Sequence, residues 1–502
     1  MGQDPAGTGT TTVLPEEFSG HGGGPAGLGG TRAALVLAWS RDEPHRVGEV
    51  ILLPGGPEPP PLLLGRGAGR PDDRAVRVTF VRQRPGRVTE TAPLGGSGIS
   101  RQQLLVRPIR GGGVHVENLG RCPLLFRGQE VDEAQVAPGE SFGLKGQLHL
   151  LCIRRPARLP RGRSWPHRLN PTFGAADDHG VVGESPAAWD LRDQLAFIAA
   201  RKPHVLILGE SGTGKELAAA AVHALSDRAR RPLIARNAST IPEGLIDAEL
   251  FGNIKDYPNP GMRDRPGLIG SADGSTLFLD EIGELPDKLQ GHLLRVLDTD
   301  GDYQRLGEDR NRKADFRLIA ATNRPAESLK HDLLARLKMR VQLTGLGDRP
   351  EDIPLIARHL MQRIAMDDDD IAGRFFDSHE GSPGPGEPRF TQILIEALLA
   401  HRWTHHVREL DAVLWAAIAS SDGTRVGLTS EATAELDRQR TAPGGAPPVK
   451  PGELTAESIR ACLDKHDWVQ ERVWKELGLK NRWVLNRLIK KHGLKVSTTE
   501  ES

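Results

Sequence analysis

The chain has 502 residues, enough for three or four ordinary domains. Lys plus Arg equals Asp plus Glu, at 66 each, so overall charge gives no argument for nucleic-acid binding, and any such argument must be local. The three cysteines, Cys122, Cys152 and Cys462, show neither a disulfide framework nor metal-ligand spacing. No secretion signal is visible, and no apolar run approaches the roughly 20 residues that span a bilayer. We therefore expect a cytoplasmic protein that does not enter a membrane.

The N-terminal third predicts a β-sandwich behind a disordered tail. Residues 1–32 are rich in Gly, Thr and Pro and predict the tail. From 33 to 155, short apolar runs alternate with Gly/Pro turns, a spacing typical of an all-β sandwich. The Arg- and Pro-rich residues 156–182 predict a linker. The runs expected to be strands are Ala34–Trp39, Val50–Leu53, Val76–Val81, Leu104–Val106, Val114–Val116 and Leu148–Ile153.

Residues 183–345 alternate buried-strand runs with helical stretches, which predicts an α/β domain with a parallel sheet. Residues 346–425 predict a helical lid, in which the acidic and Gly/Pro-rich insertion 367–388 is expected to be a mobile loop. A second linker at 426–452 precedes a short helical block at 453–495 that is basic at its end. The expected strands of the parallel sheet are His204–Leu208, Thr276–Leu279 and Phe316–Ala320.

A phosphate-binding loop is the strongest motif. Gly209-x-x-x-x-Gly214-Lys215 follows a predicted strand and opens a predicted helix, the context that a P-loop requires. The glycines let backbone N–H groups turn toward phosphate oxygens, and Lys215 adds a positive charge at the β- and γ-phosphates. The residues expected to bind nucleotide here are Gly209, Glu210, Ser211, Gly212, Thr213, Gly214, Lys215 and Glu216.

An acidic pair, Asp280 and Glu281, ends the apolar strand in "STLFLDEI". In a nucleotide-hydrolysing site, Asp280 would hold Mg²⁺, through water, and Glu281 would polarise the attacking water. An ordinary strand that ends in a solvated acidic turn is the alternative interpretation. The position of the pair, about 65 residues after the P-loop, favours the catalytic interpretation.

The strings "GESGTGKE", "ELFG", "DGSTLFLDEIGELP", "RLIAATNR" and "VREL" occur here in the order found in the sigma-54-dependent AAA+ activators. Residues 183–425 resemble that family, which implies a P-loop AAA+ ATPase that uses ATP and Mg²⁺ in transcription regulation. By resemblance, Asn237 is the switch residue that pairs with Glu281, and Asn323 is the sensor beside the γ-phosphate. Arg408 is the second sensor, on the lid.

The resemblance also implies that Arg336 is an arginine finger. Such a finger reaches the ATP of a neighbouring subunit, so it implies self-association into a ring, normally a hexamer.

Three segments depart from the family pattern. The family's sigma-54-contact motif, G-A-F-T-G-A, aligns with 256–261, where two prolines stiffen the tip and the aromatic–threonine pair is lost, although Tyr257 is a candidate substitute for the phenylalanine. Lys330 stands where the family has the first of two interface arginines, and 404–406 read "THH" instead of "PGN". ATP binding is thus expected, whereas contact with sigma-54 stays an open question.

The strings "LLLGRGAGR", "GISRQQLLV" and "VHVENLGRCPLLFRGQEV" in the N-terminal region resemble a forkhead-associated (FHA) domain, a β-sandwich that binds phosphothreonine peptides. Arg66, Ser100 and Arg101 match the positions that would bind the phosphate dianion. Gln103 replaces the usual histidine, and the usual Asn-Gly-Thr segment is replaced around Cys122. A degenerate FHA domain that serves only domain contacts is the alternative.

The C-terminal block predicts helices at 454–466, 469–477 and 481–492, with Gly478 at a tight turn. A helix, a Gly-containing turn and a basic helix predict a helix-turn-helix that places its last helix in the major groove of DNA. The block resembles the Fis-type domain found at the end of many members of this activator family. The expected DNA-binding residues are Asn481, Arg482, Arg487, Lys490 and Lys491.

Three functions are compatible with these patterns. The first is an ATP-dependent DNA-binding regulator of the sigma-54 activator type with FHA-based sensing. The second is a sigma-54-independent regulator that retains the ATPase but has lost the contact loop. The third is a non-enzymatic phosphopeptide-binding scaffold, against which Lys215, Asp280, Glu281 and Arg336 argue.

Overall fold

The computed structural model describes residues 30–440, apart from 57–58, 68–74, 299–300 and 378–385, and beyond them 456–465, 473, 485, 488–489 and 492. The described residues fall into two compact units, one within Met1–Leu428 and one within Thr429–Ser502. Among these residues, no helix combines the length and apolar character needed to cross a bilayer.

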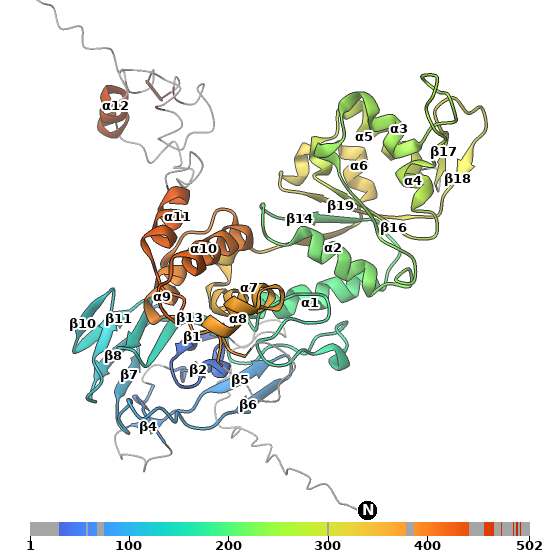
Figure 1. The fold of residues 1–502 in the computed structure, drawn as a ribbon. Coiled ribbons are helices and arrows are strands. Elements are labelled where there is room, and N and C mark those ends of the chain that lie inside the picture. Colours follow the sequence, from blue (N-terminus) through green and yellow to red (C-terminus); the bar gives the residue numbers. More distant parts are fainter. Residues whose placement is uncertain are drawn as a thin grey trace, which may run out of the picture. The chain divides into compact units, whose positions relative to one another are not determined.

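The N-terminal region is built from two β-sheets, as expected (Figure 1). The first sheet has the strand order β10-β9-β12-β13-β1-β2-β5-β6, and the second has the order β11-β8-β7-β3-β4. The strands are β1 (Thr31–Ser40), β2 (Val50–Leu52), β3 (Leu62–Leu64), β4 (Val76–Arg77), β5 (Val81–Arg84), β6 (Arg87–Glu90), β7 (Leu104–Pro108), β8 (Val114–Asn118), β9 (Leu124–Phe126), β10 (Gln129–Val131), β11 (Glu133–Val136), β12 (Ser141–Leu144) and β13 (Leu148–Pro156).

One buried apolar cluster joins the two sheets. Leu35 and Leu37 of β1 contribute to it from the first sheet, and Leu104 and Val116 contribute from the second. The intervening β1 residues Ala34, Val36 and Ala38 are also buried, so both faces of this strand are covered. A strand buried on both faces reads as a continuous apolar run, as β1 does.

Two expectations for this region are corrected. The run Val76–Val81 is not one strand, because β4 pairs in the second sheet and β5 in the first, so the chain crosses between the sheets at residues 78–80. Residues 31 and 32, assigned to the tail, begin β1 instead.

The α/β part contains a five-stranded parallel sheet with the order β15-β16-β19-β14-β20. Its side chains alternate between two buried clusters: Leu277 and Leu279 of β16 face one, and Phe278 faces the other. This period of two on a strand buried on both faces explains the short continuous apolar runs. The strands are β14 (Val205–Leu208), β15 (Ile234–Asn237), β16 (Thr276–Asp280), β19 (Arg317–Thr322) and β20 (Met339–Gln342).

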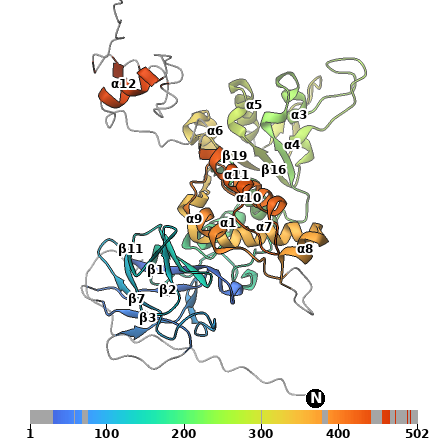
Figure 2. The same ribbon diagram turned by 60° about the vertical axis from the view of Figure 1, so that its left-hand side comes forward.

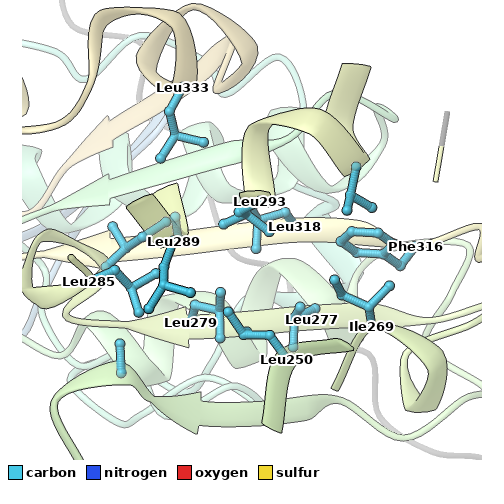
Figure 3. Close-up of a cluster of buried hydrophobic side chains, with 14 of the residues drawn as sticks. Leu250, Ile269, Leu277, Leu279, Leu285, Leu289, Leu293, Phe316, Leu318 and Leu333 are labelled. Atoms are coloured by element: carbon cyan, nitrogen blue, oxygen red, sulfur yellow. The ribbon is translucent and has the colours of Figure 1, made fainter. Parts of the chain in front are cut away.

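Helices cover both faces of the parallel sheet. On one face, α1 (Pro186–Ala199) and α2 (Lys215–Ala224) contribute to the cluster that contains Phe278. On the other, Leu250, Ile269, Leu289 and Leu333 converge on the strands (Figure 3). These four residues come from α3 (Ile246–Phe251), α4 (Gly267–Ser271), α5 (Asp287–Asp298) and α6 (His331–Arg336), respectively.

The lid comprises α7 (Ile353–Asp367), α8 (Asp369–Phe375), α9 (Gln392–Ala400) and α10 (His406–Ser420). The expectation of a mobile loop at 367–388 is wrong for 369–375, which form α8. The Asp368 carboxylate accepts hydrogen bonds from Asp370 N and Ile371 N, both at 3.0 Å, so part of the acidic run caps a helix.

Helix α9 packs on the outer face of the sandwich, against β1, β12 and β13 (Figure 2). Trp39 Nε1 donates to Phe390 O at 3.0 Å. Gln392 bridges two positions, since its Oε1 accepts from Gly146 N at 2.7 Å and its Nε2 donates to Leu148 O at 3.2 Å. These contacts bury the second face of β1 and form what we call the sandwich–lid junction.

The second unit contains α11 (Ser430–Arg440) and α12 (Ala456–Lys465). The linker expected at 426–452 is therefore helical over 430–440, where Thr429 Oγ1 accepts from Ala432 N at 3.2 Å and helix-forming residues follow. Helix α12 falls within the first helix predicted for the C-terminal block. Its Ile459 and Leu463 share a buried cluster with Val473, Leu485 and Leu488.

Candidate functional site

The loop between β14 and α2 has the backbone of a phosphate cradle. Gly212 and Gly214 have φ values of 82° and 94°, in the left-handed region that favours glycine. Gly209 is fixed by crowding, because a Cβ there would lie 2.7 Å from Thr213 Oγ1. Successive backbone N–H groups in such a loop can surround an anion, and the positive end of the α2 dipole adds to the attraction.

Lys215 lies at the first position of α2 and is buried. Its Nζ donates to the carbonyl oxygens of Gly209 at 3.1 Å and Glu210 at 3.3 Å, and lies 3.8 Å from Glu281 Oε1. The ammonium group is thus held against the loop that the sequence predicted it to serve.

The acidic pair stands at the carboxyl end of β16, across from the P-loop lysine. Asp280 Oδ1 accepts from Glu281 N at 2.9 Å, and Glu281 Oε2 accepts from Asn323 N at 3.4 Å. Parallel strands β16 and β19 bring Asn323 to the same edge of the sheet. Asn237, at the end of β15, pairs in register with Asp280.

The predicted Asn237–Glu281 pair is not formed in this structure. Asn237 Oδ1 instead accepts from Ser239 N at 2.9 Å and from Ser239 Oγ at 2.7 Å. In this way it caps the short helix Ala238–Thr240.

The lid reaches the P-loop through the start of α10. Arg408 Nη1 donates to Ser211 Oγ at 2.8 Å, and Val407 N donates to Gly212 O at 3.1 Å. Arg408 therefore lies beside the loop, where the sequence placed the second sensor.

A cavity of about 1000 Å³ lies between the P-loop and the lid. At one end it is lined by the loop together with Asn237, Asp280 and Glu281. The rest includes an apolar wall, a surface suited to a planar ring system. That wall is formed by Val181, Val182, Leu191, Ile356, Leu360, Ile364 and Trp415.

Arg336 and Lys330 lie at the two ends of α6. Arg336, about half exposed, pairs with Asp298 at the end of α5. The backbone N–H of Lys330 donates to Gln290 Oε1 at 3.1 Å. Neither residue lines the cavity of its own chain.

Comparison with known proteins places this architecture in a family. Residues 181–344 match the sigma-54 interaction domain. The Nif-specific regulatory protein of Azotobacter vinelandii is 36% identical over 322 residues, which cover 61% of this chain and 58% of that protein. Transcriptional regulatory protein ZraR of Escherichia coli K12 is 33% identical over 342 residues, covering 66% of this chain and 74% of ZraR. The chain belongs to the sigma-54-dependent transcriptional regulators.

A solved structure of NtrX from Brucella abortus in complex with ADP is 28% identical, with a TM-score of 0.44, and the match covers 63% of this regulator and 70% of that chain. The regulator thus spans between about half and three quarters of the curated relatives it matches. The match to the sigma-54 interaction domain ends at residue 344, before the helical lid.

Loop 256–261 of this sigma-54-dependent regulator is a closed turn. Asp256 Oδ1 accepts from Gly261 N at 2.8 Å, and Asp256 N donates to Met262 O at 2.9 Å. Tyr257, 43% exposed, packs over Gly307, where a Cβ would lie 2.6 Å from the tyrosine Cγ. The loop is therefore seated on the neighbouring segment around the hairpin of β17 (Asp302–Tyr303) and β18 (Arg312–Lys313).

An ion-pair network stabilises the segment on which loop 256–261 packs, and it was not predicted from the sequence. Arg305 pairs with Asp264 at 2.8 Å and with Glu308 at 3.0 Å, and Arg312 pairs with Glu308 at 2.7 Å. Arg305, Glu308 and Arg312 lie close together in the sequence, whereas Asp264 lies far from them, so the sequence gives no sign of its part in the network.

The regulator's three candidate phosphate-binding residues in the sandwich lie close together. Arg66 N donates to Ser100 O at 2.9 Å. Arg77 fastens the pair of segments, since its guanidinium donates to Arg66 O at 2.8 Å and to Arg101 O at 3.1 Å. Arg121 N donates to Ser100 Oγ at 3.1 Å, so Arg66 and Arg121 both contact this serine through their backbone N–H groups.

Gln103, which replaces the usual histidine, is buried and organises the adjoining loop. Its Oε1 accepts from Ser100 N at 3.0 Å. Its Nε2 donates to Asn118 Oδ1 at 2.7 Å and to Cys122 O at 2.9 Å. The sequence did not single out Arg77 or Arg121, because their neighbours come from distant segments.

The predicted DNA contacts cannot be placed in the same way. Asn481, Arg482, Arg487, Lys490 and Lys491 lie outside the described residues.

Proposed function

We propose that this regulator binds DNA and hydrolyses ATP in order to activate transcription by the sigma-54 form of RNA polymerase. The observation that carries the proposal is the arrangement around Lys215: a left-handed glycine loop, the Glu281 carboxylate at 3.8 Å and a lid arginine, all at one cavity. Membership of the sigma-54-dependent family supports the same function.

In this proposal ATP occupies the cavity, with its phosphates along the P-loop and its adenine against the apolar wall. Lys215 neutralises charge on the β- and γ-phosphates, and Glu281 polarises the attacking water. The carboxylate of Asp280 suits Mg²⁺, a hard cation that takes oxygen ligands and would supply further neutralisation of the phosphates. Asn323 and Arg408 act as sensors of the nucleotide state.

Asn237 is the proposed switch. Its present bond to Ser239 means that it has to change partners before it can reach Glu281. Such an exchange would connect the nucleotide state with the adjoining segment, of which Ala238–Thr240 is the first turn.

A ring completes the proposed site. The exposed Arg336, at the end of α6 and away from its own cavity, is available to a neighbouring subunit as an arginine finger. A partly exposed salt bridge with Asp298 is a weak restraint, so exchange of this partner for a phosphate is energetically easy.

The C-terminal helices supply DNA binding, with the basic third helix in the major groove and Lys490 and Lys491 on phosphates. Affinity would fall with salt, since phosphate contacts release counterions. The sandwich supplies sensing: Arg66 lies on one segment and Ser100 and Arg101 on another, and hydrogen bonds to their backbone atoms hold the two segments together, which supports a role for these residues in binding a phosphothreonine dianion. In an anisotropy titration with a phosphothreonine peptide, Arg101→Ala should lose affinity relative to the exposed control Arg127→Ala.

A separate observation favours a second candidate function. The loop 256–261 is closed by Asp256 and seated over Gly307, which favours a regulator that keeps the ATPase and acts without sigma-54. A third, the non-enzymatic phosphopeptide scaffold, requires that the purified chain not hydrolyse ATP.

The first experiment is therefore phosphate release by the purified full-length chain, compared with Lys215→Ala. We expect turnover in the natural protein and none in the variant. Absence of ATPase activity under assembled conditions would leave the scaffold.

The second experiment mixes the full-length chain with sigma-54, ADP and aluminium fluoride, which mimics the hydrolysis transition state, and resolves the products on a native gel. We expect a trapped complex that is lost when residues 256–261 are replaced. ATPase activity without any trapped complex would refute the activator and support the second candidate.

A further inference from the structure

The lid carries His406 at the first position of α10, in the segment where "THH" replaces the family's "PGN". Its φ is 49°, a left-handed conformation that asparagine and histidine tolerate better than most side chains. The substitution is therefore compatible with the backbone, and it places a longer side chain at the border between lid and P-loop.

The His406 ring bridges two other segments. Its Nδ1 lies 3.3 Å from Leu346 N, and its Nε2 lies 3.1 Å from Glu210 Oε2. Because Nδ1 accepts the backbone N–H of Leu346, the ring proton lies on Nε2 and is donated to the Glu210 carboxylate. The His406 side chain is only 7% exposed, whereas that of Glu210 is 72% exposed.

The surrounding backbone is shaped for this ring. A Cβ at Gly345 would lie 2.4 Å from His406 Cε1, so a side chain at position 345 would displace the histidine. The next two residues, Val407 and Arg408, make the hydrogen bonds to Gly212 and Ser211 of the P-loop. The ring is thus the buried member of a three-residue contact between the lid and the loop.

We propose that His406 is a positioning residue, which latches the lid to the P-loop through Glu210 and so holds Arg408 beside the nucleotide. The inference rests on the proposed ATPase. An asparagine at this position would keep the backbone conformation but would be too short to serve both Leu346 and Glu210.

The test compares ATP affinity and steady-state hydrolysis in full-length His406→Asn, Glu210→Ala and the double variant. Loss of one hydrogen bond should raise both Kd and KM for ATP by about fivefold, and kcat should change less. The double variant should be no worse than His406→Asn alone, since that change already removes the bond to Glu210. Glu210→Gln, which keeps an acceptor, should restore most of the affinity.

His405→Asn is the matched control, because its side chain is exposed and contacts Thr404 rather than the P-loop. The latch would be overturned if the losses of ATP affinity in His406→Asn and Glu210→Ala added fully in the double variant. It would also be overturned if His406→Asn bound ATP as tightly as the His405→Asn control.

Amide hydrogen exchange of the nucleotide-free chain separates this inference from the proposed function. His406→Asn should speed exchange of Leu346 and Val407 even if the protein binds no ATP, because their N–H groups are held by the latch and by the docked lid. Unchanged exchange at both amides refutes the latch. If the natural chain does not bind ATP, the proposed ATPase activity is refuted. The exchange rates of the two amides then still test the latch.

Discussion

Glu281 has a left-handed backbone, with a φ of 51°, directly after β16. For a residue with a Cβ this conformation costs roughly 1–2 kcal/mol. The same conformation accompanies a carboxylate that lies near Lys215 Nζ and accepts from Asn323 N. Strain at this position is therefore maintained by the groups that surround the proposed nucleotide.

Replacing Glu281 by Gln should separate binding from hydrolysis. The amide keeps the size of the side chain but cannot act as a general base, so kcat should fall by roughly 10²–10⁴-fold. The affinity for ATP, measured by titration with a fluorescent nucleotide, should change little. Glu284→Gln, which alters an exposed acid in the following turn paired with Arg324, is the control. Normal turnover in Glu281→Gln would mean that another group activates the water.

At the scale of elements, the start of α10 depends on one buried acid. Glu409 accepts from the backbone N–H groups of Thr404 and His405, each at 2.9 Å, and from His401 Nε2 at 2.7 Å. This is a capping arrangement in which an acid of the first turn reaches back to the residues before the helix. Burial alone would raise the pKa of Glu409, but the bonds from His401, His405 and Thr404 outweigh it and lower the pKa to about 2.

The lowered pKa of Glu409 determines how this residue's contribution to stability changes with pH. Because the folded value is below that of an unfolded glutamate, near 4.3, its stabilising contribution is present above that pH and is lost as pH falls toward about 2. Glu409→Gln should therefore lower the unfolding temperature at pH 7. At pH 3 the difference in unfolding temperature between the variant and the natural protein should be smaller. A gap that is equal at both pH values would contradict this role.

The elements differ in how far the sequence predicts them. The three central parallel strands, β14, β16 and β19, were predictable, because a strand buried on both faces is a short apolar run. The edge strands β15 and β20 were not predicted, since they are partly exposed and carry charged residues. The crossing at residues 78–80 was not, since an apolar pattern does not tell which sheet a residue joins. Asp368 as a cap and Arg77 as a bridge were missed for a related reason. Their roles depend on local hydrogen bonds or on distant carbonyl groups rather than on a motif.

The residues of the candidate site also divide into those that a motif predicts and those that only the fold reveals. Lys215, Asp280, Glu281 and Arg408 lie in ordered motifs, and the structure brings all four to one cavity. His406 was visible only as a departure from a tripeptide, and its partners are 60 and 196 residues away in the chain. Contacts at such separations follow from the fold and leave no local pattern.

For the whole molecule, the proposed arginine finger makes activity a property of neighbouring subunits. Lys215→Ala has an intact Arg336 and an inactive P-loop, whereas Arg336→Ala has the reverse. Each variant alone should be inactive, and a mixture should regain measurable ATPase activity, because some interfaces then combine an intact loop with an intact finger. Phosphate release as a function of the mixing ratio measures this. No recovery in mixtures that demonstrably co-assemble would argue against a finger that acts in trans.

The sandwich–lid junction depends on a glycine at one position, Gly143. A Cβ at Gly143 of β12 would lie 2.4 Å from Gln392 Nε2 and 2.6 Å from His149 Nδ1. A side chain at position 143 would therefore crowd the Gln392 amide and also the Leu148 carbonyl oxygen, at 2.7 Å. A single-base change in one codon is enough to turn glycine into alanine, so one mutation in β12 can disturb the hydrogen bonds by which Gln392 of α9 is held to the N-terminal region.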